Sequence, residues 1–157
     1  MELILWRHAE AAPGDPDAAR ALTERGRRQA ESMARWLAPR LSRDLRIVVS
    51  PARRAQETAR TLGRSFETVE ALAPECDVAT LLKIADWPGS ERPVLVVGHQ
   101  PTLGEVAARL IDGRQSAWQF GACGVCWLRK NPRKGRSEAT LLLAMESEIL
   151  EREGPRS

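Results

Sequence analysis

The chain has 157 residues, of which 43% are hydrophobic and 29% charged, a composition typical of a globular domain that buries its core without disulfide or metal support. No apolar run approaches the roughly 20 residues of a membrane-spanning helix, and the N-terminus lacks a signal-peptide pattern. We therefore expect one cytoplasmic domain over residues 1–157, with no membrane partner. The net charge of +3 and the lack of interleaved basic and aromatic residues argue against a nucleic-acid partner.

Strands and helices are predicted to alternate through the first half of the chain. Residues 2–6 form an expected strand, and residues 24–38 a helix whose inward stripe is Ala30, Met33, Ala34 and Leu37. A second strand is expected at Ile47, Val48 and Val49. Ser50 and Pro51 then suit the N-cap and the first position of a helix that runs to about Leu62 and stops at Gly63.

The second half continues the same alternation. We expect a short strand near 66–69, a helix over 78–86 and an apolar strand over 94–97. Thr102 and Glu105 have capping-box spacing and predict a helix to about Ile111, ended by Gly113. Strands near 118–128 and 138–145 suit an antiparallel hairpin with a basic turn, and the charged tail from about 147 is expected to fray. The pattern predicts a three-layer α/β/α fold with a mixed, mostly parallel sheet.

Both histidines of the chain follow apolar strands. His8 comes directly after the first strand, and His99 after the strand at 94–97. Because ligands of open α/β sheets bind beyond the carboxyl ends of the strands, both imidazoles are predicted at one site. Arg7 and Arg54 reach the same edge, together with two helix N-termini, which favour anions. Two arginines, two imidazoles and two helix starts describe a site for a phosphoryl group.

Five motifs resemble those of the histidine phosphatase superfamily, which has the phosphoglycerate-mutase-like fold, and within it the SixA-type phosphohistidine phosphatases. The matching pieces, in the family's order, are Arg7-His8-x-Glu10-Ala11, Leu22-Thr23-x-x-Gly26, Ser50-Pro51-x-x-Arg54-Ala55-x-x-Thr58, Leu72-x-Pro74-x-x-Asp77 and Gly98-His99-x-Pro101-x-x-Gly104. The resemblance implies that His8 is the nucleophile that becomes phosphorylated. It also implies that Arg7, Arg54 and His99 complete the phosphate pocket, with no metal or other cofactor.

Several residues keep alternative interpretations. Arg53 is a rival of Arg54, although the motif spacing selects Arg54. Glu10, Glu75 and Asp77 are candidates for a general acid, and Asp77 equally suits the N-cap of the next helix. Thr23 and Gly26 fit the cap and first turn of a helix better than a catalytic role. Ala9 stands where many family members have glycine, which affects how closely the backbone approaches the phosphoryl group.

The three cysteines, Cys76, Cys123 and Cys126, include one CxxC pair. No second CxxC exists to complete a zinc site, and the pair does not open a helix as a thioredoxin-like motif would. We therefore expect Cys123 and Cys126 to be structural thiols in a strand. A pair of metal-binding histidines is disfavoured by the neighbouring arginines, which would repel a cation.

The leading hypothesis is a metal-independent phosphatase in signal transduction that removes phosphate from the phosphohistidine of a partner protein, such as a phosphotransfer domain or a phosphocarrier. A phosphorylated imidazole leaves without a strong general acid, whereas an alkoxide needs one. The short intervals between motifs leave little chain for a lid, so an open pocket is expected. The alternatives are a small-molecule phosphomonoesterase of the same superfamily and a non-catalytic phosphoprotein-binding module.

Overall fold

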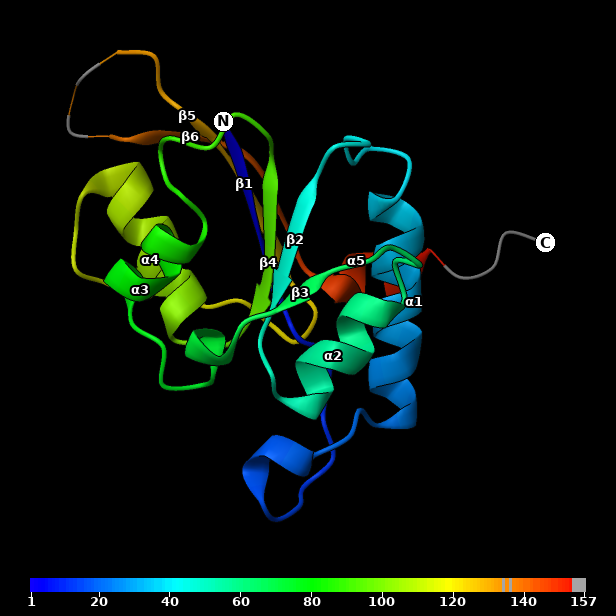
Figure 1. Cartoon of the computed structure of the whole chain (residues 1–157). Coiled ribbons are helices and arrows are strands. Elements are labelled where there is room, and N and C mark those ends of the chain that lie inside the picture. Colours follow the sequence, from blue (N-terminus) through cyan, green and yellow to red (C-terminus); the bar gives the residue numbers. More distant parts are fainter. Residues whose placement is uncertain (134, 136, 154–157) are drawn as a thin grey trace.

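The computed structural model, which describes residues 1–133, 135 and 137–153, is built on one six-stranded sheet (Figure 1). The strand order is β3-β2-β4-β1-β5-β6. The strands are β1 (Glu2–Arg7), β2 (Arg46–Val49), β3 (Glu67–Thr68), β4 (Val94–Gly98), β5 (Val125–Lys130) and β6 (Ala139–Met145). The first four are mutually parallel, and β5 and β6 are antiparallel to their neighbours. The predicted mixed, mostly parallel sheet is confirmed.

Helices cover both faces of this sheet (Figure 1). One face carries α1 (Glu24–Leu37), α2 (Arg53–Arg60) and α5 (Ser147–Arg152), and the other carries α3 (Val78–Ile84) and α4 (Thr102–Asp112). Two short 3-10 turns connect strands to helices: η1 (Asp17–Ala19) lies between β1 and α1, and η2 (Glu70–Leu72) lies between β3 and α3. The three-layer α/β/α arrangement is therefore confirmed. None of the helices that the structure describes is long and apolar enough to cross a membrane.

The apolar runs of the central strands reflect burial on both faces. Leu3 and Leu5 of β1 pack under α3 and α4, whereas Ile4 and Trp6 pack under α1 and α2. All four side chains have no solvent exposure. Because alternate residues of a strand point to opposite faces of the sheet, a strand whose two faces are both covered by helices needs apolar residues at every position.

The predicted cap of α2 is wrong. The helix begins at Arg53 after Ala52, two residues later than expected, and Ser50 does not cap it. The Ser50 hydroxyl instead accepts from the Ala52 amide at 3.2 Å and lies 2.7 Å from Nε2 of His99. Thr102 likewise lies inside α4, and its hydroxyl donates to the Cys76 carbonyl. Tertiary partners outcompete the local capping pattern at both positions.

The strand expected from residue 118 begins only at Val125. Cys123 adopts a left-handed backbone with φ of 64°, which ends any extended run before it. Cys126 lies in β5, but Cys123 lies in the preceding turn, so only one of the two thiols is in a strand. Both are buried, and burial raises the pKa of each to about 12. The basic turn at 130–136 falls partly outside the described residues.

The charged tail, expected to fray from about residue 147, begins with a helix. Residues 147–152 form α5, and the buried Ser147 hydroxyl donates to the Ala122 carbonyl at 2.9 Å. Leu150 packs against the core beneath α1, and Glu151 pairs with Arg25 at 3.2 Å. These contacts with α1 and with the loop before β5 stabilise a helix that the charged sequence of this segment does not predict. Residues 154–157 lie outside the described part of the chain.

Candidate active site

Three chain segments meet at one edge of the sheet because their parallel strands end there. Arg7, the last residue of β1, is opposite Gly98, the last residue of β4. The His8 amide donates to the Gly98 carbonyl at 3.1 Å, and the Ser50 amide donates to the Val97 carbonyl at 3.0 Å. The residues that follow β1, β2 and β4 are thereby brought together, as the order of strands and helices predicted.

The His8 imidazole is held in one tautomer. Its Nδ1 lies 2.8 Å from the Ala9 carbonyl, which can only accept a hydrogen bond, so Nδ1 carries the proton. Nε2 therefore keeps its lone pair and accepts from Nε of Arg54 at 3.3 Å. Burial lowers the pKa of His8 to about 4, and the charges of Arg54, Arg7 and Arg20 add to this, while the Ala9 carbonyl opposes it. The imidazole is neutral and oriented at pH 7, as a nucleophile requires.

Arg54 is the buried cation of the site, with 4% of its surface exposed. Besides His8, its guanidinium donates to the Asp17 carbonyl from Nη1 at 2.9 Å and to the Asp17 carboxylate from Nη2 at 3.0 Å. The neighbouring Arg53 is exposed and pairs with Glu57 on α2 at 3.2 Å. The helix thus separates the two arginines, and Arg54 is the one that contacts His8.

The His99 ring lies 5.1 Å from that of His8, centroid to centroid, at an interplanar angle of 55°. Its Nδ1 accepts a long 3.5 Å contact from Nη2 of Arg54, so Nε2 carries the proton and donates to Ser50 Oγ at 2.7 Å. Burial lowers the pKa of His99 to about 3, and His8 and Arg54 lower it further, while Asp17 opposes the shift. A dianionic phosphoryl group beside the ring would reverse this balance and favour the protonated form.

Arg7 reaches the pocket from the end of β1. Its Nη1 donates to the Phe120 carbonyl at 2.5 Å, in the loop before β5. Its Nε is buried and has no hydrogen-bond partner within the described part of the chain. A buried N–H that lacks a protein acceptor costs free energy unless an anion or water satisfies it. The buried Nε–H of Arg7 therefore favours an anion in the pocket.

A buried threonine ties the His8 segment to α2. The Thr58 hydroxyl accepts from the Ala9 amide at 3.0 Å and donates to the Arg54 carbonyl at 2.7 Å. One side chain thus fixes the residue that orients His8 and the helix turn that carries Arg54. Gln29 of α1 supports the same segment, because its side-chain oxygen accepts from the Glu10 amide at 3.1 Å.

Two of the three candidate acids are engaged by other partners, and the third is exposed. Glu10 accepts from the Thr23 hydroxyl at 2.7 Å and pairs with Arg25 at 3.4 Å. Asp77 caps α3 by accepting from the Thr80 amide at 2.8 Å, and Glu75 is exposed. The N-cap interpretation of Asp77 is therefore the one the structure supports.

Asp17 is the carboxylate that contacts the site, and the sequence analysis missed it. It lies on η1 and pairs with both Arg54 and Arg20 at 3.0 Å. These two arginines hold the pKa of Asp17 below its ordinary value, so it is ionised at pH 7. The only local signal was an acidic stretch rich in proline and glycine at 13–17, which indicates a loop but no target for it.

Thr23 and Gly26 have structural roles, as expected. The Thr23 side chain caps α1 by accepting from the Gly26 amide at 2.9 Å. A Cβ added to Gly26 would lie 2.0 Å from the Glu10 carbonyl oxygen. Only glycine lets α1 approach the His8 segment this closely.

The assembled site suits a tetrahedral oxyanion. Arg54 donates to Nε2 of His8, the His99 ring lies beside it, and the charge of Arg7 acts on the same imidazole. Planar guanidinium donors match phosphate oxygens. Over the described ranges, no group of three or more His, Cys, Asp and Glu side chains is arranged to hold a metal ion.

Comparisons with known proteins agree with this geometry. Residues 3–81 match the family model of the histidine phosphatase superfamily (branch 1). A phosphohistidine phosphatase SixA homolog of Haemophilus influenzae is 32% identical over 73% of this chain and 79% of its own. Phosphohistidine phosphatase SixA of Escherichia coli is 31% identical over 72% and 76%.

The solved structures show the same likeness over nearly the whole chain. A structure of the protein histidine phosphatase SixA complexed with tungstate superposes with a TM-score of 0.77 and 27% identity, and covers 96% of this chain and 99% of the other. An Escherichia coli protein described as a "putative alpha-ribazole-5'-P phosphatase" shares the fold at 22% identity and a TM-score of 0.71, over 94% of this chain and 98% of the other. From its family model, its relatives and its fold, this chain belongs to branch 1 of the histidine phosphatase superfamily.

Proposed function

We propose that this protein is a metal-independent phosphatase that removes the phosphoryl group from a phosphohistidine of a partner protein, through an intermediate phosphorylated on His8. The observation that carries the proposal is the fixed tautomer of His8. Its Nδ1 proton is bound to the Ala9 carbonyl, and its Nε2 lone pair is presented beside Arg54. In the proposed reaction Arg7, Arg54 and His99 bind the three equatorial phosphoryl oxygens.

In the first step, the Nε2 lone pair of His8 attacks phosphorus and the P–N bond of the substrate phosphohistidine breaks. The substrate imidazole is protonated on its other nitrogen near neutral pH, so it leaves as a neutral ring without help from an acid. The transfer exchanges one imidazole for another on the same phosphoryl group. Atoms and protons balance, and the two arginines neutralise the charge that spreads over the oxygens.

In the second step, water attacks phosphorus in line with the P–Nε2 bond. The bonding electrons return to Nε2, and both protons of water leave with the product as H2PO4−. His8 regains the tautomer in which Nδ1 donates to the Ala9 carbonyl. The two steps leave the protonation of His8 as it was, whereas His99, whose pKa is depressed in the free site, is favoured as imidazolium while the phosphoryl dianion is bound.

The carboxylates around the site favour phosphohistidine over phosphate monoesters. An alkoxide leaving group needs proton donation. Glu10 and Asp77 are bound elsewhere, and Asp17 is held ionised by Arg20 and Arg54. The curated relatives named as phosphohistidine phosphatases support the same substrate class, and tungstate, which one of the matched structures binds, is a tetrahedral oxyanion like phosphate.

The test is release of inorganic phosphate from a protein phosphorylated on histidine, compared with free phosphohistidine and with a panel of phosphate monoesters, in the presence of a chelator. His8→Ala serves as the matched control. We expect release from both phosphohistidine substrates by the unmodified protein only, with acid-labile phosphate trapped on it after rapid quenching.

Other outcomes would replace the proposal. Turnover of monoesters alone would assign the protein to the small-molecule branch of the superfamily. Phosphate binding without turnover of any substrate would indicate a phosphoprotein-binding module. Equal phosphohistidine turnover by His8→Ala would remove His8 as the nucleophile.

A further inference from the structure

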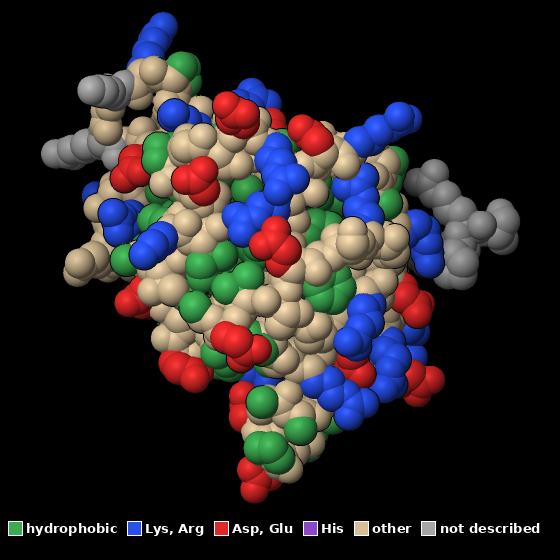
Figure 2. Space-filling view, viewed as in Figure 1, with side chains coloured by type: hydrophobic (Ala, Val, Ile, Leu, Met, Phe, Trp, Pro, Cys, Tyr) green, Lys and Arg blue, Asp and Glu red, His purple; other side chains and the backbone are tan. Residues whose placement is uncertain are grey.

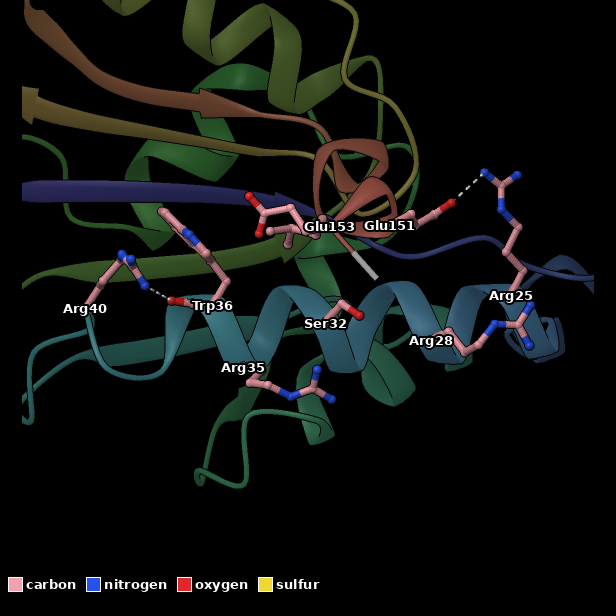
Figure 3. Close-up of a pocket in the computed structure, with 9 residues that line it drawn as sticks. Arg25, Arg28, Ser32, Arg35, Trp36, Arg40, Glu151 and Glu153 are labelled. Atoms are coloured by element: carbon pink, nitrogen blue, oxygen red, sulfur yellow. Dashed lines mark hydrogen bonds and ion pairs between the residues drawn. The ribbon is translucent and has the colours of Figure 1, made fainter. Parts of the chain in front are cut away.

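A groove between α1 and α5 lies outside the phosphate pocket (Figure 3). It has a volume of about 640 Å³. Its lining includes three arginines of α1, Arg25, Arg28 and Arg35, and Arg40, which follows the helix. Its apolar lining residues are Trp36 and Leu150. We call it the α1–α5 groove. Figure 2 shows Lys and Arg side chains gathered over α1 and α2.

The arginines of α1 form a stripe along the groove. With 100° of rotation per residue, Arg25, Arg28 and Arg35 fall within about 80° on the helix surface. The side chains of Arg25 and Arg28 are 48% and 64% exposed. Arg28 has only a 3.8 Å contact with Glu24, and Arg35 has no carboxylate partner among the residues that the structure describes. Arg25 is paired with Glu10 and Glu151, so the positive charge left without a close carboxylate lies on Arg28 and Arg35.

The apolar part of the groove is held in place. Arg40 stacks on the Trp36 ring at 4.1 Å and donates from Nη1 to the Trp36 carbonyl at 2.6 Å (Figure 3). Trp36 and Leu150 offer apolar surface beside the charges. Tryptophan and arginine are the side chains most often found at the energetic centre of protein interfaces, and a preorganised ring loses little entropy on binding.

One end of the groove lies near the chain segment that carries His8. Arg25 donates to the Glu10 carboxylate at 3.4 Å, and Glu10 is two residues from His8. From Arg25 to Arg35 the helix rises about 15 Å. A standard protein interface covers about 800 Å² on each partner, which corresponds to a disc of about 16 Å radius. A partner whose interface runs from His8 along α1 would cover the stripe.

We infer that the α1–α5 groove docks an acidic amphipathic helix of the phosphohistidine-bearing partner. The acidic side chains pair with Arg28 and Arg35, and an apolar residue of the helix packs on Trp36 and Leu150. The carboxylates of Glu151 and Glu153 on the opposite wall would repel negative charge there, so the docked helix carries its acidic side chains only on the face toward α1. A nucleic acid, with phosphates along its whole backbone, does not meet that condition. The inference rests on the proposed function and names the surface by which that function selects its substrate.

The experiment compares two charge-reversal pairs in the full chain. Arg28→Glu with Arg35→Glu reverses the stripe. Arg43→Glu with Arg92→Glu makes the same change of net charge on exposed residues that precede β2 and β4, at the edge of the sheet opposite His8. The substrates are an acidic histidine phosphotransfer domain phosphorylated on histidine, and free phosphohistidine. Arg25 is left unchanged because it contacts Glu10.

We expect the stripe variant to lose at least about tenfold in kcat/KM on the phosphorylated domain and to retain turnover of free phosphohistidine. The kcat/KM of the control variant should change less than about twofold on both substrates. Added salt should reduce the difference in kcat/KM between the two variants on the phosphorylated domain. Equal kcat/KM of the two variants on the domain, or an equal loss on free phosphohistidine, would overturn the docking surface. So would tighter stripe-dependent binding of duplex DNA than of the domain.

Failure of the proposed function is recognised separately, because the unmodified protein would then release no phosphate from either phosphohistidine substrate. Binding of the unphosphorylated domain, measured by titration calorimetry, does not depend on chemistry. Loss of that binding in the stripe variant alone would support the groove even if the reaction were a different one.

Discussion

The Asp17 carboxylate lies 3.0 Å from Nη2 of Arg54, the same guanidinium that donates to His8. The two partners differ in their surroundings, because the Arg54 side chain is 5% exposed and that of Asp17 is 57% exposed. Moving the Arg54 side chain into solvent would disrupt the packing around it and cost free energy, whereas the Asp17 side chain already lies largely in solvent. An arriving phosphoryl group therefore competes with Asp17 for a cation that is already in place.

The first prediction concerns this competition. Asp17→Asn removes a negative charge and keeps the shape of the side chain, so inorganic phosphate should bind about two- to fivefold more tightly, in line with the size of a largely exposed ion pair. Titration calorimetry at low salt measures the dissociation constant. Asp44→Asn, on an exposed loop before β2, is the control and should leave it unchanged. Weaker phosphate binding by Asp17→Asn would show that Asp17 supports the site rather than competing with its ligand.

The second prediction is a loss of stability in mild acid. The pKa values of His8 and His99 fall from 6.5 to about 4 and about 3 on folding, mainly through burial. Below pH 6.5 the unfolded chain takes up protons that the folded protein excludes. The free energy of unfolding therefore falls as the pH drops from 6.5 toward 4, by up to about 1.4 kcal/mol per pH unit for each histidine.

Urea unfolding at pH 7, 6 and 5 measures this dependence. The double variant His8→Asn with His99→Asn should show a slope between pH 6 and pH 5 that is smaller by about 2 kcal/mol per pH unit. Carboxylates titrate equally in both proteins, so the difference isolates the histidines. Parallel pH profiles of the two proteins would contradict the assignment.

The third prediction concerns Thr58. In Thr58→Val the Ala9 amide loses its buried acceptor, so the free energy of unfolding should fall by about 1–3 kcal/mol. Because Ala9 orients His8, phosphatase activity should also fall by about tenfold. Thr58→Ser keeps the hydroxyl and should recover most of the activity. Urea midpoints and initial rates measure both effects, and equal activity of the valine and serine variants would exclude a positioning role for the hydroxyl.

The fourth prediction concerns the approach of α1 to the His8 segment. The Cβ of Gly26→Ala would lie 2.0 Å from the Glu10 carbonyl oxygen, so backbone must shift and unfolding should become easier by at least about 2 kcal/mol. Gly14→Ala is the control, since its Cβ meets its nearest atom, Cγ of Arg20, at 3.4 Å. The melting temperature of Gly14→Ala should stay near that of the unmodified protein. Equal melting temperatures of the two variants would contradict the close contact.

Much of the architecture follows from local pattern. The apolar runs of β1 and β4 and the caps at Thr23 and Asp77 placed strands and helix starts within one or two residues. Because parallel strands end at one edge of a sheet, alternation of strands and helices predicted that the segments after β1, β2 and β4 meet there, and the motif spacing selected Arg54 over Arg53. Periodicity, capping and chain direction are short-range properties, and a sequence carries them openly.

Other features depended on contacts between distant segments. Ser50 fits a helix cap by its neighbours, yet it lies against His99, 49 residues away. The sequence of the loop before β5 predicts a strand, but the left-handed backbone at Cys123 interrupts it. The loop instead contacts the site, because the Phe120 carbonyl accepts a hydrogen bond from Arg7. The charged segment at 147–152 becomes a helix because α1 offers it a surface.

The sequence by itself determined the fold class and the edge of the sheet where His8 and His99 lie, and its motifs, through the resemblance to the superfamily, indicated Arg7 and Arg54. Only the tertiary structure decided which carboxylate faces Arg54, which tautomer His8 adopts and where a groove opens beside α1. The reason is physical: periodicity and caps act within a few residues, whereas the partner of Asp17 lies 37 positions away and is selected by packing.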